Sequence, residues 1–473
     1  MKRLLFIVLL ALALPAQSQN LVRVIPVDTT LTFTINFIAN GLARYNVANY
    51  KLLYTTPDSA GNPSVASGML SLPLKNCTDF SLVNYNHGTV LRRNNVPSRN
   101  NFESIIGKVF ASRGYVTTMP DYLGLGDSPG MHPYVHAETQ ATATVDMMRA
   151  ARQALADSIP GYNLNGEVFL TGYSQGGHAA MATAKYIQDN SLQTEFNVVG
   201  AAPASGPYNL AGSQSEVFIL DQPYSNPGYV VYLLLGMNAA YNGTLFNNPS
   251  EILKSPYDTL IPPYFNGLYP MDSVNNKLPA RVSGYLQDSV LQAFVADTVA
   301  QNHWLWQVLN DQNNYDWTPD SKMRLFYCTN DEQVAFENSL DAEAAMNANG
   351  AMDVIAVNGG PLTHGGCVTP SLSGAAFFFD SLSTGCSSFI NLAEDQLDQI
   401  SFYPNPSRDR ITISTNNDDQ VALRIYDMNG RLAHSEKVSN GARINLAQFD
   451  AGIYFIEFEI DNHLRREKLL ITK

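Results

Sequence analysis

The chain has 473 residues, which exceeds the usual size of one domain and predicts a large core domain with a smaller one beside it. Its composition is that of a globular protein, with 45% hydrophobic and 15% charged residues. The formal charge of −13 argues against nucleic acid or an anionic membrane surface as a partner.

Residues 1–18 have the pattern of an export signal. Lys2 and Arg3 give a positive start, residues 4–14 form an apolar run, and Ala16-Gln17-Ser18 is a small-x-small cleavage site. The apolar run is shorter than the about 20 residues that span a bilayer, which disfavours a membrane anchor. We therefore expect a secreted or cell-surface protein that loses this segment.

Export also makes disulfide bonds possible. The four cysteines allow three pairings, among which the sequence does not choose: Cys77, Cys328, Cys367 and Cys386. Their spacing fits neither a zinc cluster nor a redox Cys-x-x-Cys motif.

Strand-like patterns fill residues 20–74. Apolar residues alternate with Thr and Asn over 31–37, which predicts a half-buried strand. Further strands are expected over 50–56, 66–74 and 80–85, because β-forming residues there are separated by turn residues.

Strands and helices then alternate. Apolar strands are predicted over 114–120, 167–171 and 197–204, with helices over 137–157 and 177–185.

A Gly-x-Ser-x-Gly pattern at residues 172–176 lies between one of these strands and the following helix. A serine at the apex of such a strained turn needs neighbours without bulk, and Gly172 and Gly176 meet that demand. Ser174 is therefore the candidate nucleophile.

The interval from about 206 to 320 lacks a strand–helix rhythm and contains aromatic and apolar clusters. An insertion of this size between core strands predicts a cap over the active site. The cap would line an acyl-binding pocket or simply cover the core, and His303 within it is expected to be a structural residue.

The core resumes with a strand-like stretch that ends in Asp-x-x-Val at residues 331–334. Asp331 lies on the loop after the strand, where a triad acid is expected. Glu332 is the nearby rival for this role.

A helix over 339–349 and a strand over 352–357 lead to a glycine-rich loop that contains His364. The chain order Ser174, Asp331, His364 matches the order of nucleophile, acid and base in one large class of hydrolases.

From about residue 50 to 384 the chain resembles an α/β-hydrolase of the secretory lipase/esterase type. The matching stretches are Asn86-His87-Gly88-Thr89, the turn at 114–124, the serine motif, Asp331-x-x-Val334 and His364-Gly365. His87 and Asp121 lie in these stretches but are expected to be structural.

This resemblance implies an α/β-hydrolase catalytic domain over 19–393, with a mostly parallel sheet, helices on both of its faces and a large cap insertion. The domain would act on a small-molecule or lipid ester. It implies an oxyanion hole formed by the backbone N–H groups of Gln175 and Thr89. The chemistry needs no metal and no organic cofactor.

The tail, 394–473, has a polar linker, a Tyr-Pro-Asn-Pro start at 403–406 and alternating strand patterns. Strands are predicted over 410–414, 421–427 and 453–460, with Asn429-Gly430 as a hairpin turn. This β-sandwich resembles the type A C-terminal sorting domain of type IX secretion, which implies the outer-membrane export machinery as a partner. A carbohydrate-binding β-sandwich is the alternative.

The leading hypothesis is a secreted serine ester hydrolase that forms an acyl-enzyme intermediate. A serine peptidase of the same fold (dipeptidyl or tripeptidyl type) and a non-enzymatic binding protein on a hydrolase scaffold are the alternatives.

Overall fold

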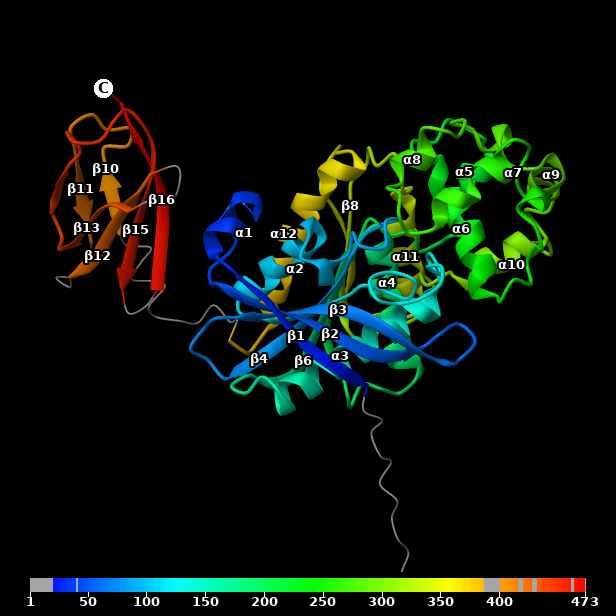
Figure 1. Cartoon of the computed structure of the whole chain (residues 1–473), viewed down its shortest axis with the longest axis horizontal. Coiled ribbons are helices and arrows are strands. Elements are labelled where there is room, and N and C mark those ends of the chain that lie inside the picture. The colour runs from blue at the N-terminus through cyan, green and yellow to red at the C-terminus, as the bar shows by residue number, and fades with distance from the viewer. Residues whose placement is uncertain are drawn as a thin grey trace, which may run out of the picture. The chain divides into compact units, whose positions relative to one another are not determined.

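The computed structural model describes residues 20–39, 41–386, 400–415, 420–427, 432–460 and 463–472. The chain divides into two compact units, Met1–Ser387 and Ser388–Lys473 (Figure 1). The predicted export signal, most of the predicted linker and the Asn429-Gly430 turn lie outside the described residues.

The first unit contains a nine-stranded sheet in the order β1-β2-β3-β5-β4-β6-β7-β8-β9. The strands β1, β2 and β3 run antiparallel to their neighbours, and the remainder of the sheet is parallel. The strand bounds are β1 (Leu21–Thr30), β2 (Val47–Pro57), β3 (Pro63–Pro73), β4 (Asp79–Asn86), β5 (Val116–Pro120), β6 (Asn163–Tyr173), β7 (Asn197–Ala204), β8 (Lys322–Tyr327) and β9 (Val354–Asn358).

The register of the parallel strands brings their carboxyl ends to one level. Tyr173 at the end of β6 pairs with Ala204 at the end of β7, and Tyr327 at the end of β8 pairs with Asn358 at the end of β9. Loops that follow these strands therefore meet at one edge of the sheet, where open α/β sheets bind ligands.

Helices cover both faces of this sheet because successive strand residues point to opposite sides. In β6, for example, Phe169 packs into the core on one face and Leu170 into the core on the other. One core includes residues of α3 (Ala137–Asp157), α4 (Gln175–Asp189) and α11 (Glu337–Ala348), and the other includes residues of α2 (Phe102–Ser112) and α12 (His364–Leu382).

The strand predicted over 31–37 is wrong, since this segment forms helix α1 (Thr32–Ala39). Ile35 and Ala39 lie four residues apart on one helical face and are buried, whereas Phe37 is 85% exposed. The side chain of Asn46 accepts a hydrogen bond from the Thr32 N–H at 2.8 Å and so caps the first turn. The apolar alternation at odd-numbered positions was coincidental.

Short helices fill the segment between β7 and β8, which we call the cap (residues 206–320). They lie together at one end of the first unit in Figure 1 and share a core that includes Val231, Phe294 and Trp306. The α-helices of the cap are α5 (Glu216–Ile219), α6 (Pro227–Ala240), α7 (Tyr257–Leu260), α8 (Asp272–Asn275), α9 (Asp288–Ala296) and α10 (Trp304–Asp311).

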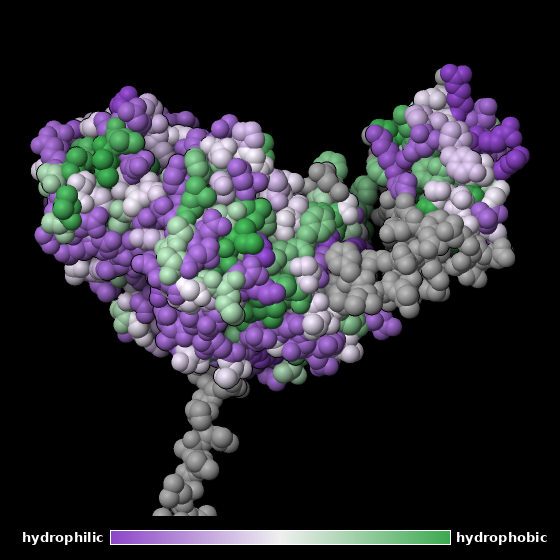
Figure 2. Space-filling view, turned by 180° about the vertical axis from the view of Figure 1, so that it is seen from behind, coloured by the Kyte–Doolittle hydropathy of each residue, from purple (hydrophilic) through white to green (hydrophobic). Residues whose placement is uncertain are grey.

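The surface of the first unit is largely hydrophilic, with apolar residues gathered into patches on the face shown in Figure 2. Within the described ranges, none of the helices has the length and apolar character that a membrane crossing requires.

The second unit consists of two antiparallel sheets, as the tail pattern predicted. Their strands enclose a core that includes Ile411, Leu423 and Phe458. One sheet contains β10 (Ser401–Tyr403), β11 (Arg410–Ser414) and β14 (Arg443–Asn445); the other contains β13 (Leu432–Val438), β12 (Val421–Tyr426), β15 (Gly452–Ile460) and β16 (His463–Ile471).

Two disulfide bonds, which the sequence left open, join Cys77 to Cys386 and Cys328 to Cys367. The second bond connects the loop after β8 to the first turn of α12.

Candidate active site

Ser174 lies in a tight turn between β6 and α4. Its φ of 60° and ψ of −122° place a non-glycine residue in a strained conformation. A Cβ added to Gly172 would lie 2.2 Å from the carbonyl oxygen of Gly176, and one added to Gly176 would lie 2.0 Å from that of Asn86. Both glycines are therefore required for the turn.

Asp331 and His364 are in direct contact. Nδ1 of His364 lies 2.7 Å from Oδ2 of Asp331. The other carboxylate oxygen of Asp331 accepts backbone N–H bonds from Gln333 at 3.0 Å and Val334 at 2.9 Å, which fix the orientation of the carboxylate.

The backbone of His364 is held from two sides. Its N–H donates to Oε2 of Glu332 at 3.0 Å, and its carbonyl accepts a 2.6 Å hydrogen bond from the hydroxyl of Tyr173. Because Tyr173 directly precedes Ser174, this bond links the serine turn to the histidine loop. Glu332, the rival acid in the sequence, contacts the backbone of His364, whereas Asp331 contacts its ring.

The structure therefore brings Asp331 and His364 together and ties His364 to the residue before Ser174. Ser174 and His364 are 8% and 7% exposed, so both are buried. Among the described residues, no hydrogen bond joins the Ser174 hydroxyl to the His364 ring in this conformation; such bonds are often long or poorly aligned in enzymes without substrate.

The residues predicted to form the oxyanion hole flank the same turn. Gln175 begins α4, so its backbone N–H has no acceptor within the helix. Thr89 follows the end of β4, and its hydroxyl shares a 2.8 Å hydrogen bond with that of Tyr134.

His87 and Asp121 hold loops, in agreement with their predicted structural roles. The ring of His87 lies 3.2 Å from the Asp121 carbonyl and packs against the ring of Tyr122. The Asp121 carboxylate accepts hydrogen bonds from the Ser67 hydroxyl at 2.6 Å and the Ser98 N–H at 3.0 Å. Burial raises the pKa of this carboxyl group.

A small cavity of about 60 Å³ lies between the serine turn and the cap. Ser174 and Gln175 line it on one side, and apolar cap residues such as Leu210, Phe218 and Leu233 line it on the other. The wall on the side of the cap is therefore largely apolar.

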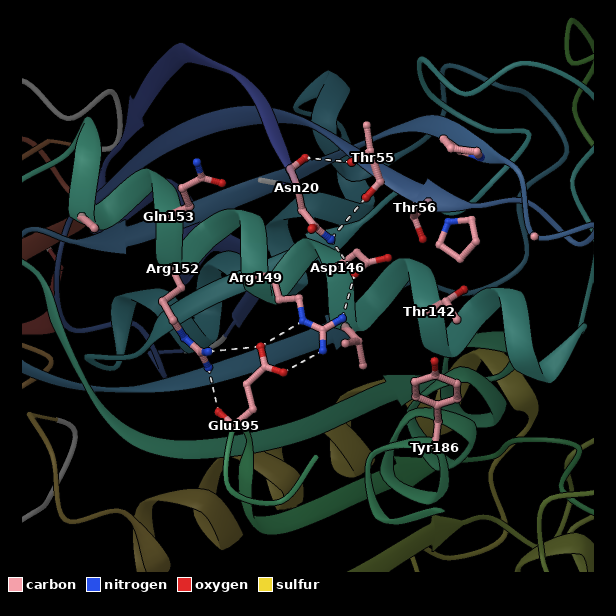
Figure 3. Close-up of a pocket in the computed structure, with 15 residues that line it drawn as sticks. Asn20, Thr55, Thr56, Thr142, Asp146, Arg149, Arg152, Gln153, Tyr186 and Glu195 are labelled. Carbon is pink, nitrogen blue, oxygen red and sulfur yellow. Dashed lines mark hydrogen bonds and ion pairs between the residues drawn. The ribbon is translucent and has the colours of Figure 1, made fainter. Parts of the chain in front are cut away.

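A larger groove of about 930 Å³ runs along α3 and contains neither Ser174 nor His364 (Figure 3). Its charged side chains pair with one another: Arg149 with Glu195 at 2.7 Å and with Asp146 at 3.1 Å, and Arg152 with Glu195 at 3.4 Å. With its charges compensated and without a candidate nucleophile, this groove is not the candidate catalytic site.

Sequence reasoning missed two residues that support the site, His132 and Tyr134. They come from the loop between β5 and α3 and contact the side chains of Gln175 and Thr89 respectively. The only signal in the sequence was the density of histidine and aromatic residues over 131–136.

A serine turn after a central strand, an Asp–His pair on later loops at the same sheet edge, and helices on both faces define the α/β-hydrolase class.

Comparisons with known proteins also indicate a hydrolase of this class. Residues 101–252 match the family model described as secretory lipase, and residues 401–472 match the secretion system C-terminal sorting domain. A search of the curated proteins gave no match.

Solved structures similar to this chain include esterases and lipases. The rice cell wall degrading esterase LipA of Xanthomonas oryzae is 28% identical, with a TM-score of 0.68 over 78% of this chain and 99% of that one. A Legionella pneumophila protein thought to be a hydrolase is 26% identical, with a TM-score of 0.70 over 77% of this chain and 98% of its own. Candida antarctica lipase A, at 17% identity and a TM-score of 0.55 over 76% of this chain and 82% of its own, supports the fold alone.

The chain is thus a carboxylic-ester hydrolase with an α/β-hydrolase fold and a C-terminal sorting domain. The predicted resemblance, fold class and enzyme class are confirmed. The two family matches also indicate a secreted or cell-surface protein.

Proposed function

We propose that the enzyme cleaves carboxylic esters through a Ser174–His364–Asp331 triad and an acyl-enzyme intermediate. The observation that carries this proposal is the 2.7 Å contact between Asp331 and Nδ1 of His364 beside the strained serine turn. Because Nδ1 donates its proton to the carboxylate, Nε2 is left as the acceptor for the proton of Ser174.

The reaction proceeds in two steps. The Ser174 oxygen attacks the ester carbonyl while its proton passes to Nε2 of His364; collapse of the tetrahedral intermediate expels the alcohol, which takes that proton. Water then attacks the acyl-enzyme with the same proton transfers and releases the acid. The backbone N–H groups of Gln175 and Thr89 stabilise the oxyanion, and loss of one such donor costs about 10²–10³ in rate.

We also propose an export route for this enzyme. Residues 1–18 direct the chain out of the cytoplasm and are removed, the catalytic domain spans 19–393, and the domain over 394–473 is recognised by the type IX machinery of the outer membrane. The peptidase alternative has no support from the family match or from the esterase LipA, and the ester hydrolase is therefore the function we propose.

The substitution Ser174→Ala tests this proposal. Hydrolysis of p-nitrophenyl butyrate should fall to the small residual rate of a triad-less site, and labelling by a fluorophosphonate should disappear. The exposed Ser250→Ala is the matched control and should retain both signals. Labelling of the Ser174→Ala variant, or undiminished hydrolysis by it, would exclude Ser174 as the nucleophile.

A further inference from the structure

His132, which contacts the side chain of Gln175, exists in one tautomer. Nδ1 of His132 lies 2.8 Å from the carbonyl oxygen of Leu123, so Nδ1 carries the proton. Burial lowers the pKa of His132 to about 3, which keeps the ring neutral at ordinary pH. Its Nε2 is therefore an acceptor.

This tautomer fixes the orientation of the Gln175 amide. Only the NH₂ group can donate to Nε2 of His132, which lies 2.6 Å from the Gln175 nitrogen. The rotated amide would place two acceptors against each other.

The carbonyl end of the Gln175 amide is left without a partner. Gln175 is 1% exposed, and its Oε1 has no hydrogen bond among the described residues. Buried acceptors in this condition are costly unless a ligand or an ordered water supplies a donor.

Gln175 lines the cavity beside Ser174, and two tyrosine hydroxyls of the same cavity are already engaged in hydrogen bonds. The hydroxyl of Tyr134 is bonded to Thr89, and that of Tyr224 donates to the Gln333 carbonyl at 2.9 Å. Oε1 of Gln175 thus lacks a protein partner among the described residues, one residue from the candidate nucleophile.

We propose that Oε1 of Gln175 accepts a hydrogen bond from a hydroxyl group of the substrate, so that the enzyme prefers esters with a hydroxyl within a few bonds of the ester carbonyl. His132 is the positioning residue that presents this oxygen. The inference rests on the proposed function, because it places the hydroxyl relative to an ester held at Ser174.

The expected preference for hydroxy esters follows from the unpaired Oε1 of Gln175. An ester without the hydroxyl leaves Oε1 unsatisfied in a site closed to solvent, and sites built around a substrate hydroxyl discriminate against analogues that lack it. A preference on the order of tenfold or more in kcat/KM is expected.

The test compares three esters with the full chain by titrating the released acid: methyl butanoate, methyl 3-hydroxybutanoate and 2-hydroxyethyl butanoate. Each kcat/KM is divided by the rate of alkaline hydrolysis, which removes intrinsic reactivity. One of the two hydroxy esters should exceed methyl butanoate by about tenfold. Which of them does so shows whether the hydroxyl belongs to the acyl or to the alcohol part.

The variants Gln175→Met and His132→Phe should reduce this ratio toward one. The first removes the acceptor and keeps the backbone N–H; the second releases the amide from its fixed orientation. Gln222→Met, at an exposed position that does not line the cavity, is the matched control and should keep the wild-type ratio.

Equal corrected values for all three esters in the wild-type chain would overturn the proposal, and this comparison requires no variant to fold. A preference that persists in Gln175→Met would also overturn it. Ester hydrolysis that survives in Ser174→Ala would instead overturn the proposed function, so the two failures are distinguishable.

Discussion

The Cys328–Cys367 disulfide should matter for catalysis beyond its effect on stability. It joins the loop that carries Asp331 to the first turn of α12, which begins at His364. Its sequence separation is 39 residues. In the chain-entropy model a cross-link of this span contributes about 4 kcal/mol, between about 3 for 15 residues and about 4.7 for 100.

Replacing both cysteines by alanine should therefore reduce the free energy of unfolding in urea by about 4 kcal/mol. It should also lower kcat for p-nitrophenyl butyrate by about tenfold to 10², measured under conditions where the variant is folded, because a small displacement of a catalytic group has that cost.

The Cys77–Cys386 bond provides the matched control. Its sequence separation is 309 residues, so its removal should destabilise the chain by at least as much, more than about 4.7 kcal/mol in the same model. The hydrogen bonds of Cys77 and Cys386 in the described part of the chain are with Lys75 and Asp79, near the start of β4, and the folded variant should keep kcat within about twofold. Equal losses of kcat in both variants, or none in either, would refute the positioning role of the first bond.

Two further predictions concern the acid and the pH dependence of stability. Asp331→Asn should lower kcat by about 10⁴, because the amide favours the wrong tautomer of His364. Glu332 contacts only the backbone N–H of His364, so Glu332→Gln should lower kcat by no more than about tenfold. A larger loss of kcat in the Glu332 variant than in the Asp331 variant would assign the acid to Glu332. Burial lowers the pKa of His132 to about 3 and of His178 to about 4, from 6.5, so the unfolded chain binds protons that the folded chain excludes. The free energy of unfolding should therefore fall as the pH drops from about 6.5 to about 4, by up to about 1.4 kcal/mol per pH unit for each histidine. Urea unfolding at pH 7 and pH 5 measures the slope, which His178→Gln should reduce; a flat profile in the native sequence would contradict this account.

Much of the catalytic unit was predictable because its signals are local. Runs of β-forming residues before glycine-rich turns marked β6, β8 and β9, and the carboxyl ends of these strands carry the loops of Ser174, Asp331 and His364. The Asp331–His364 contact required only that these loops meet at one sheet edge.

Other features depend on contacts between distant segments and leave no local pattern. In α1 the alternation of apolar and polar residues predicted a strand. The segment instead forms a helix, which buries Ile35 and Ala39 against the rest of the unit. The roles of His132 and Tyr134 likewise depend on side chains contributed by other loops. The cysteine pairs join positions that only the folded chain brings together.

The Cys77–Cys386 bond also bears on the maturation of the protein. The bond follows the last turn of α12, and the N–H of Cys386 donates to the Asp79 carbonyl at 2.8 Å. A protease that cuts anywhere beyond this cysteine leaves α12 attached at both ends, at its start by Cys328 and beyond its end by Cys77. A chain shortened after residue 386 would therefore keep both disulfide bonds, and we expect it to keep the fold of the first unit.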